Sequence, residues 1–396
     1  MSSLVPDGWS WHKLGDSLNS RPKSKLLSGE SDPLGYYDFY VCSKKVLKSF
    51  HNEHSSPSVL LSTGGEAAVH FATERYAFST DVWATEFEGD ICNEYVFRLL
   101  EENIRTINYS GFQGSGIKHL DKSFIEKLEF SIPPLPEQKK IASILTSVDE
   151  VIENTQKQID KLQDLKKATM NELLTKGIGH TEFKDSELGR IPVSWEVGAI
   201  SSLANFTSGF AFSSGDFSET GLLCIRMGNL YNNEFNPLRS PQYLPREFAS
   251  HHPRFVVTAG DLLISMTGTA GKEDYGFLVE VPNEFNQGLL NQRVGKVIPK
   301  NQDAKAFIRE LMRSRLYLEQ LFSFGSGTKQ ANLSQSQIMG ISIPIPPIDE
   351  QRLIGETVSN VSDTINALSR KLHQTQSLKK SLMQDLLTGK VRVTVN

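Results

Sequence analysis

Glycine-containing motifs are the first places in this sequence where residue types and spacing could do chemistry, and that chemistry would be phosphate or nucleotide binding. Residues 268–272 read Gly-Thr-Ala-Gly-Lys, which resembles the end of a phosphate-binding loop. That loop also needs a glycine five positions before Gly271 and a Ser or Thr after the lysine, where this sequence has Glu273. Residues 111–116 carry their glycines in the wrong order for a dinucleotide fingerprint. Neither motif predicts a nucleotide site.

Histidines, cysteines and carboxylates form no set that predicts catalysis. His51 and His54 lie near Cys42 and could contribute to a metal site, but an isolated pair at this spacing usually lies in a solvated loop. His251, His252 and the scattered carboxylates do not supply a nucleophile, a base and an orienting group. We therefore expect no catalytic residue, no metal and no cofactor in this chain, and a protein that holds a partner without transforming it.

An internal repeat shows which elements must position the remaining polar residues. Residues 132–138 read Ile-Pro-Pro-Leu-Pro-Glu-Gln and residues 345–351 read Ile-Pro-Pro-Ile-Asp-Glu-Gln. The offset between Glu137 and Glu350 is 350 − 137 = 213, and between Leu174 and Leu387 it is 387 − 174 = 213, so the register does not slip. Self-similarity of this length determines the architecture.

The repeat continues more faintly upstream of these segments. Residues 6–9 end in Trp9 and residues 192–195 end in Trp195, an offset of 195 − 9 = 186, so the second variable part is longer by 213 − 186 = 27 residues. A Gly-Ser-Gly stretch begins at residue 114 and again at residue 325. The chain thus reads as variable, constant, variable, constant, and we expect both tryptophans to anchor cores.

Each constant segment predicts a helix of about 40 residues, roughly 60 Å long. A Pro-Pro pair precedes each one, and Gly177 and Gly389 lie where helices usually stop. Residues at alternating spacings of four and three form a coiled-coil seam. The seam is Ile141, Leu145, Val148, Ile152, Thr155, Ile159 and Leu162 in the first segment, and Ile354, Val358, Val361, Ile365, Leu368, Leu372 and Thr375 in the second.

The two predicted helices are expected to pair with each other in antiparallel orientation, because a folded domain lies between them in the chain. The alternative is that each helix packs only on its own domain. Two lysine pairs, at residues 166–167 and 379–380, are expected on solvated helix faces or at partner contacts, with the DNA backbone as a lesser option.

The variable parts predict compact, β-rich domains with exposed loops. Their strongest strands lie at residues 58–65 and 260–268, each ending in a glycine turn. Further strands are expected at residues 95–100, 222–227, 255–257, 277–281 and 293–298.

Composition is that of a soluble globular protein with two domains. The chain has 396 residues, of which 38% are hydrophobic and 22% charged. The first eleven residues lack an apolar core after a basic stretch, and no run of some 18 apolar residues occurs, so we expect neither export nor a membrane. Three scattered cysteines, Cys42, Cys92 and Cys224, cannot all pair within the chain, which fits a reducing cytoplasm.

The two Pro-Pro-x-x-Glu-Gln helices, each following a variable part, resemble the specificity subunit of type I restriction-modification enzymes over essentially the whole chain. The residues that carry this resemblance are Pro133, Pro134, Glu137 and Gln138 with Pro346, Pro347, Glu350 and Gln351. The resemblance implies an α+β fold with two β-rich target recognition domains, separated by two long antiparallel helices in a coiled coil, and an internal pseudo-two-fold repeat. We place the domains at residues 1–132 and 179–344, and the spacer helices at 133–178 and 345–396.

The resemblance also implies function and partners. Each variable domain would read one half of a bipartite double-stranded DNA sequence. The helices would separate the halves and bind two methyltransferase (M) subunits, which methylate adenine at N6, and ATP-dependent restriction (R) subunits would join that core. S-adenosylmethionine, ATP and Mg would belong to those partner subunits, and the chain itself would be non-catalytic.

The side chains expected to contact DNA are donors and amides in glycine-flanked loops, since Arg reads guanine, Asn or Gln reads adenine and Lys often contacts phosphate. They are Gln113, Lys118 and His119 in the first domain, and Arg226, Asn229, Lys272, Gln292, Arg293, Lys329, Gln330 and Asn332 in the second. For residues 327–332 the alternative is a turn that docks the helix. Residues 1–130 contain 13 Lys and Arg against 18 Asp and Glu, so a partner is expected to supply part of the grip on DNA.

Two rival functions remain at this stage. A self-contained restriction enzyme or methyltransferase would need an Asn/Asp-Pro-Pro-aromatic motif for adenine methylation, which this sequence lacks. An antiparallel coiled-coil scaffold with protein-binding domains and no DNA role would show no salt-dependent affinity for DNA.

Overall fold

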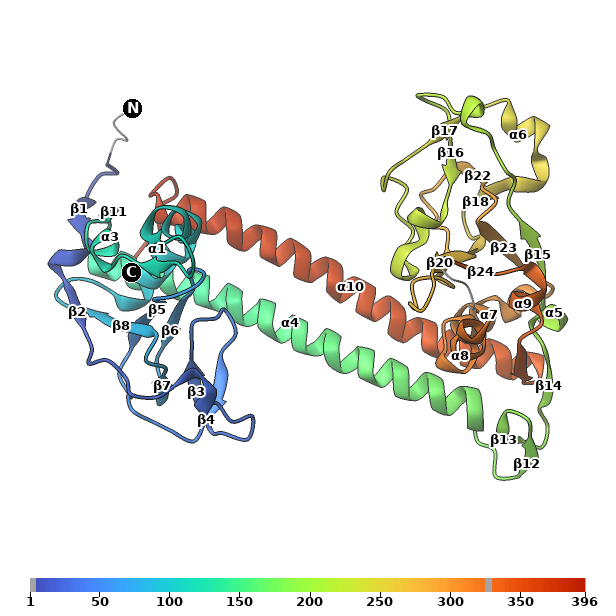
Figure 1. The fold of residues 1–396 in the computed structure, drawn as a ribbon, viewed down its shortest axis with the longest axis horizontal. Coiled ribbons are helices and arrows are strands. Elements are labelled where there is room, and N and C mark those ends of the chain that lie inside the picture. Colours follow the sequence, from blue (N-terminus) through green and yellow to red (C-terminus); the bar gives the residue numbers. More distant parts are fainter. Residues whose placement is uncertain (1–4, 325–329, 396) are drawn as a thin grey trace. The chain divides into compact units, whose positions relative to one another are not determined.

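The computed structural model describes residues 5–324 and 330–395, which fall into two compact units (Figure 1). Unit 1 comprises Met1–Lys157 and Ser369–Asn396, and unit 2 comprises Gln158–Leu368. Each unit therefore combines one variable domain with part of both constant segments. The boundaries of the four predicted domains stay predictions, because the compact units cut through the constant segments.

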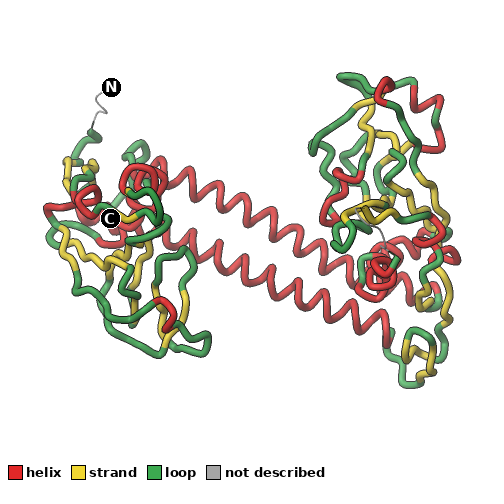
Figure 2. The backbone as a smooth tube through the Cα atoms, viewed as in Figure 1, coloured by secondary structure: helices red, strands yellow, loops and turns green. Residues whose placement is uncertain are grey.

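The described part of unit 1 contains a four-stranded and a three-stranded sheet besides two strand pairs, with strands drawn in yellow in Figure 2. The first is antiparallel and has the strand order β2 (Leu18–Ser20), β8 (Val82–Phe87), β5 (Ser58–Ser62) and β6 (Val69–Ala72). The second has the order β4 (Leu47–Ser49), β3 (Tyr37–Tyr40) and β7 (Tyr76–Phe78), with β3 and β7 parallel. Helix α1 (Asn93–Glu102) packs on the first sheet through Val96 and Leu100, and a strand pair, β1 (Ser10–Lys13) with β11 (Glu129–Ile132), closes the domain.

Unit 2 repeats this plan with longer connections. Its first sheet has the order β15 (Ala204–Ser208), β23 (Val294–Pro299), β19 (Leu262–Ser265) and β21 (Leu278–Glu280). The second has the order β17 (Tyr243–Leu244), β16 (Leu222–Ile225), β22 (Gln287–Leu290) and β18 (Val256–Thr258), with β16 and β22 parallel. Helices α7 (Lys305–Met312) and α8 (Arg315–Ser323) pack on the first sheet, and β14 (Glu196–Ala199) pairs with β25 (Ser342–Ile345).

The repeat therefore extends through the variable domains, where the two sequences have diverged. The offset from β1 to β14 is 196 − 10 = 186, and from β2 to β15 it is 204 − 18 = 186. After the inserted residues, the offset from β11 to β25 is 342 − 129 = 213. Asp121 and Ser334, also 334 − 121 = 213 apart, each cap a short helix, α3 (Lys122–Glu126) and α9 (Gln335–Met339). One fold has thus been built twice with different side chains.

The two constant segments form the long helices that the sequence predicts. Helix α4 (Leu135–Lys176) has 42 residues and α10 (Ile348–Leu387) has 40. Each begins directly after its Pro-Pro pair, and Gly177 and Gly389 end them with φ of 67° and 71°, a conformation that favours glycine.

The helices are antiparallel. In unit 1, Ile141 and Leu145 near the start of α4 share an apolar cluster with Met383 and Leu386 near the end of α10. In unit 2 the order is reversed, since Leu174 at the end of α4 belongs to one cluster with Ile354 at the start of α10. The predicted fold class is confirmed. The alternative arrangement is also partly present, because both clusters include residues of the adjoining domain.

The predicted seam residues lie on the protected face of both helices. Ile141, Leu145, Thr155, Ile159, Ile354 and Val358 are buried, and Val148, Ile152, Leu162, Val361, Ile365, Leu368, Leu372 and Thr375 are half-buried. Their pairing along the middle of the helices stays a prediction.

One predicted strand is wrong. Residues 95–100 lie in α1, where Tyr95 and Leu99 face the cluster around α4 while Val96 and Leu100 face the sheet. A short helix buried on two sides is apolar almost throughout, so its sequence cannot be told from a buried strand. The other predicted strands are confirmed within three residues of their bounds, and Trp9 and Trp195 are buried core residues as predicted.

The expectation for the lysine pairs is wrong for Lys166 and Lys379. Lys166 forms an ion pair with Glu310, and Lys379 forms ion pairs with Glu101 and Asp149. Because 379 − 166 = 213, the repeat places the same inward-facing lysine on both helices. The following lysines, Lys167 and Lys380, are exposed.

Candidate nucleic-acid interface

In both units the segment ahead of the long helix is hydrogen-bonded to the loop that follows a buried strand. In unit 1 the amide of Leu120 donates to the carbonyl oxygen of Thr63, at 3.0 Å. In unit 2 the amide of Leu333 donates to the carbonyl oxygen of Met266, at 2.8 Å. The offset is again 333 − 120 = 213. The two sets of predicted DNA-contacting residues beside these leucines therefore occupy equivalent places.

The predicted residues in these segments have exposed side chains. Gln113 and His119 face each other in the pair β9 (Phe112–Gln113) and β10 (His119–Leu120), and the exposed Lys118 directly precedes His119. Gln330 and Asn332 lie in β24 (Gln330–Asn332), which pairs with β20 (Thr267–Thr269). Backbone groups attach both segments to the variable domains, which leaves the side chains of Gln330 and Lys118 available to a ligand. The side chain of Asn332 is used within the domain, because its Oδ1 accepts from the hydroxyl of Thr267, at 3.0 Å.

Unit 1 has a basic groove that offsets its acidic composition locally. A cavity of about 340 Å³ is lined by Arg21, Lys23, Asp81, His119 and Lys122, among others. The Nζ atom of Lys122 lies 4.8 Å from the centre of the Trp83 ring, at cation–π distance. We call this cavity the first groove. Arg21 is already paired with Glu86, so Lys23 and Lys122 are the cationic side chains of this groove that suit an anionic backbone.

Unit 2 has a groove of a different chemical character, which we call the second groove. It has a volume of about 360 Å³, and its lining includes Tyr231, Arg239, Asp274, Phe277 and Gln330. The guanidinium carbon of Arg239 lies 4.5 Å from the ring centre of Tyr231, and that ring meets Phe277 edge-on at 5.3 Å.

The loop that presents Arg239 is held by two residues that the sequence analysis expected to contact DNA. The buried side chain of Asn229 donates to the carbonyl oxygens of Asn236 and Arg239, at 3.0 and 3.1 Å, and accepts from the amide of Arg226, at 2.9 Å. Arg226 donates from Nη2 to the carbonyl oxygen of Ser240, at 2.7 Å. The side-chain amide of Asn229 thus shapes the loop. Its predicted contact with DNA stays a prediction, and these internal hydrogen bonds do not support it.

The floor of the second groove is a tight turn around Asp274. Its Oδ1 accepts from the amide of Thr269 and its Oδ2 from the hydroxyl of Thr269, both at 2.6 Å. These hydrogen bonds from Thr269 hold the pKa of the carboxyl below its usual range. A Cβ on Gly268 would lie 2.4 Å from Oδ1 of Asp274, so only glycine fits there. The resemblance to a phosphate loop at residues 268–272 comes from this turn.

Of the remaining residues predicted to contact DNA, three lie in exposed loops next to β20 and β23, and one lies outside the described residues. Lys272 is exposed on the turn after β20, and Gln292 and Arg293 are exposed just before β23. The carbonyl oxygen of Arg293 accepts from the amide of Met266, at 3.0 Å, which brings that loop next to β24. Lys329 lies outside the described residues.

Sequence reasoning missed Arg21, Lys122, Tyr231 and Arg239, because none of them belongs to a motif. The one available signal for Arg239 was the asparagine-rich stretch before it, which predicts a sharply turning loop.

The histidine pair considered for metal binding has a structural role in part. The ring of His54 stacks on Phe78, with ring centres 5.0 Å apart, and burial lowers its pKa. Within residues 5–324 and 330–395, no group of three or more His, Cys, Asp or Glu residues could hold a metal ion. No helix in the same residues is both long and apolar enough to cross a membrane.

The repeated Glu-Gln motif ties the start of each long helix to the segment that follows the other helix. Glu137 accepts from Nε and Nη2 of Arg392, at 2.8 and 2.7 Å. Glu350 accepts from Nε2 of His180 at 2.9 Å and from Nε1 of Trp195 at 2.8 Å. The offset between Arg392 and His180 is 392 − 180 = 212, one less than the repeat offset of 213, so the two clasps are held from neighbouring rather than equivalent positions.

The glutamine of the motif closes the turn just before each helix. Nε2 of Gln138 donates to the carbonyl oxygen of Pro133, at 2.9 Å, and Nε2 of Gln351 donates to that of Pro346, at 2.8 Å. Gln138 also accepts from the amide of Cys92, at 2.8 Å, which attaches the start of α4 to the domain ahead of α1. The motif is therefore structural.

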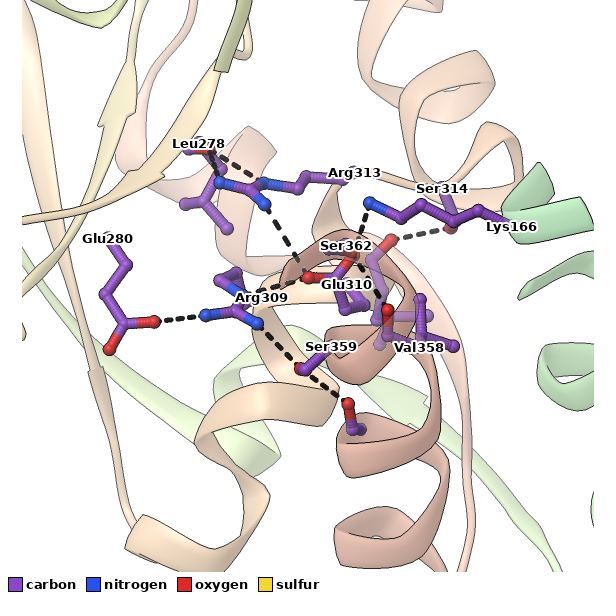
Figure 3. A network of polar contacts seen from close by, with 12 residues as sticks. Lys166, Leu278, Glu280, Arg309, Glu310, Arg313, Ser314, Val358, Ser359 and Ser362 are labelled. Carbon is purple, nitrogen blue, oxygen red and sulfur yellow. Dashed lines mark hydrogen bonds and ion pairs between the residues drawn. The ribbon is translucent and has the colours of Figure 1, made fainter. Parts of the chain in front are cut away.

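A buried ion-pair network fixes the domain of unit 2 to the long helices (Figure 3). Glu310 of α7, 1% exposed, pairs with Lys166 of α4 at 3.1 Å and with Nε of Arg309 at 2.9 Å. Burial raises the pKa of Glu310, but Lys166, Arg313 and Arg309 outweigh it, so the pKa is lowered.

The same network reaches the sheet and α10. Nη2 of Arg309 donates to the hydroxyl of Ser359 in α10, at 2.7 Å, and Arg309 also pairs with Glu280 of β21. Arg313 donates from Nε and Nη2 to the carbonyl oxygen of Leu278, at 2.9 and 2.7 Å. Strand β21 directly follows the turn that forms the floor of the second groove. The groove is therefore positioned against the long helices by charged hydrogen bonds.

Comparisons with known proteins give one consistent result. A model of the family described as the type I restriction modification DNA specificity domain matches residues 6–164 and 192–376. The type I restriction enzyme MjaVIII specificity subunit of Methanocaldococcus jannaschii is 29% identical over 409 residues, covering 98% of this chain and 94% of the relative.

Solved structures show the same fold. The S subunit of a type I restriction-modification system from M. genitalium aligns with a TM-score of 0.72 at 15% identity, over 98% of both chains. A chain from a structural study of complex assembly and conformational transition of the type I R-M system aligns with a TM-score of 0.51 at 16% identity, over 98% of this chain and 100% of that chain.

Proposed function

The chain belongs to the family of type I restriction-modification specificity subunits, non-catalytic proteins that recognise DNA, and on that premise we propose how its parts divide the work. Residues 1–132 read one half of a bipartite double-stranded DNA target, and residues 179–344 read the other half. The helical segments at 133–178 and 345–396 separate the two readers.

One observation carries this proposal: equivalent backbone positions carry unlike side chains in the two units. Lys118 and His119 precede Leu120, whereas Ala331 and Asn332 precede Leu333, in segments that are bonded to their domains in the same way. Equivalent backbone segments can present their side chains to DNA in similar orientation, and sequence is read by the side chains. The two half-sites should therefore differ.

The partners follow from the same family membership. Two methyltransferase subunits bind the long helices, and restriction subunits join that assembly. The whole assembly acts in the cytoplasm. S-adenosylmethionine, ATP and Mg belong to those subunits. The names of the relatives, and a solved relative whose title describes complex assembly, support the partner subunits. The three free cysteines support the cytoplasm, where disulfides are rare.

A domain exchange tests the proposal. Residues 192–340 are replaced by the corresponding part of a relative with a different known target, and methylated adenines are mapped in the genome of a host that expresses all partner subunits. We expect one half of the methylated sequence to change to that of the donor while the other half and its spacing stay the same. A change in both halves, or in neither, would contradict the modular assignment.

DNA binding by the assembled subunits separates this function from that of a protein-binding scaffold. A DNA reader should bind duplex DNA with an affinity that falls steeply as salt rises, because phosphate contacts release counterions. Binding that does not depend on salt, or no binding with all partners present, would favour the scaffold.

A further inference from the structure

We propose that Arg239 reads a guanine in the half-site of the second domain, from a position set by the ring of Tyr231. This inference rests on the proposed function, because it assumes that the second domain faces DNA. It adds the residue, the base and the mode of contact. A planar guanidinium can donate two parallel hydrogen bonds to O6 and N7 of guanine in the major groove.

The guanidinium of Arg239 is free for such a contact. Within residues 5–324 and 330–395 its side chain has no hydrogen bond and no ion pair, and its guanidinium carbon lies 4.5 Å from the ring centre of Tyr231. By contrast, Arg309 and Arg313 of the same unit are fully engaged inside the protein. A cation that stacks on a ring keeps its N–H groups in the plane available for a partner.

The loop holds Arg239 in a defined place. Asn229 accepts and donates hydrogen bonds that close the loop on both sides, including one to the carbonyl oxygen of Arg239 itself, at 3.1 Å. Three residues other than glycine have positive φ here, Asn232 at 57°, Asn233 at 59° and Ser240 at 47°. Such residues cost free energy, and they persist where surrounding contacts over-determine them, often at functional sites. A preordered loop loses less entropy when DNA binds.

The surroundings favour a base edge over a phosphate as the partner of Arg239. The second groove is lined by the partly exposed side chains of Tyr231 and Met227, which are 52% and 41% exposed, and by the ionised carboxylate of Asp274. A phosphate placed there would meet that carboxylate, whereas a neutral base edge would not. Lys272, on the exposed turn beside the groove, is better placed for the backbone.

The test compares two substitutions that separate base reading from charge. Arg239→Lys keeps the charge but loses the bidentate fork, and Arg239→Ala loses both. Each variant is expressed with its partner subunits, and base frequencies are determined at every position of the methylated target. We expect both variants to lose discrimination by about 10- to 100-fold at one guanine of one half-site, while the other half-site is unchanged. Arg246→Ala, an exposed arginine of the same domain, is the matched control and should leave the target unchanged.

Three outcomes would overturn the inference. If Arg239→Lys keeps full discrimination while Arg239→Ala weakens methylation of all sites equally, Arg239 contacts phosphate. If neither variant changes any position, Arg239 contacts no base. A variant that abolishes methylation is assayed for duplex binding with the purified complex, where unchanged affinity and unchanged base preference would also contradict the assignment. If the domain exchange changes one half-site but the Arg239 variants leave every base of the target unchanged, this inference is refuted and the proposed function stands.

Discussion

Units 1 and 2 attach their domains to the long helices at equivalent positions but with different residues. In unit 1, Nη2 of Arg98 donates to the hydroxyl of Thr146, at 2.9 Å; in unit 2, Nη2 of Arg309 donates to that of Ser359, at 2.7 Å. The hydroxyls are 359 − 146 = 213 residues apart. The grooves of the two domains differ in charge and in the side chains that line them. The repeat therefore conserves the attachment to the helices and leaves the lining of the grooves free to vary.

The attachments also differ in burial. The carboxylate in unit 2 belongs to Glu310, whose side chain is 2% exposed, whereas that of Asp149 in unit 1 is 35% exposed. Charges taken out of water depend on their partners far more than charges at the surface. The comparison predicts that unit 2 is the more vulnerable of the two to loss of a single charge.

The largest effect is expected for Glu310→Ala. Its removal leaves Lys166, Arg309 and Arg313 without their shared partner in a buried site, which should destabilise unit 2 by about 3–5 kcal/mol. Denaturant unfolding followed by circular dichroism measures this loss. Glu172→Ala, at an exposed carboxylate of α4 that is 65% exposed, is the control and should change stability by less than about 0.5 kcal/mol.

Asp149→Ala sharpens the same comparison. It should cost clearly less than Glu310→Ala, because Glu101 remains beside Arg98 and Lys379 and water reaches the site. Equal losses for the two variants would contradict the idea that burial sets the difference.

A smaller effect is expected for the clasp in unit 2. Glu350→Ala removes the acceptor for Nε1 of Trp195, a side chain with 0% exposure. An unsatisfied buried donor costs about 1–3 kcal/mol, which thermal unfolding of the complex or the free chain would detect. Trp195→Phe removes the donor as well, so the losses of Glu350→Ala and Trp195→Phe should be less than additive in the double variant. Additive losses in the double variant would argue against this hydrogen bond.

The smallest effect concerns pH and the clasp in unit 1. Hydrogen bonds from Arg392 lower the pKa of Glu137, so the folded carboxylate binds its proton more weakly than the unfolded one, whose pKa is about 4.3. Its contribution is then complete above about pH 5 and is lost as pH falls through the folded pKa. The stability gap between the natural chain and Glu137→Gln should be constant from pH 6 to 8 and narrow below about pH 4.5. A gap that widens with acid would contradict this sign.

The long helices could be predicted from sequence because their signals are local. Heptad spacing, the Pro-Pro starts and Gly177 or Gly389 at the ends each act within a few residues. Helix α1 was missed because its apolar residues face two sides. Lys166 and Lys379 were placed in solvent because their acidic partners are far away in the chain, where no spacing rule applies.

The candidate interface was predictable only in part. Gln330 and Lys118 stand out because glycines flank them in both repeats. Arg239 lies in a loop and Lys122 begins α3, both outside any motif, and what distinguishes them is the ring beside each, Tyr231 and Trp83. Those contacts exist only after the domains have folded.

Site-directed cross-linking tests most directly whether the two domains read separate halves of the target. A photoreactive residue is placed at Lys122, in the first groove, or at Gln330, in the second groove, and the assembled complex is cross-linked to a duplex that contains the methylated sequence. Each position should cross-link to its own half-site, with the two sets of nucleotides separated by an unread spacer. Cross-links from both positions to the same half-site would contradict the account.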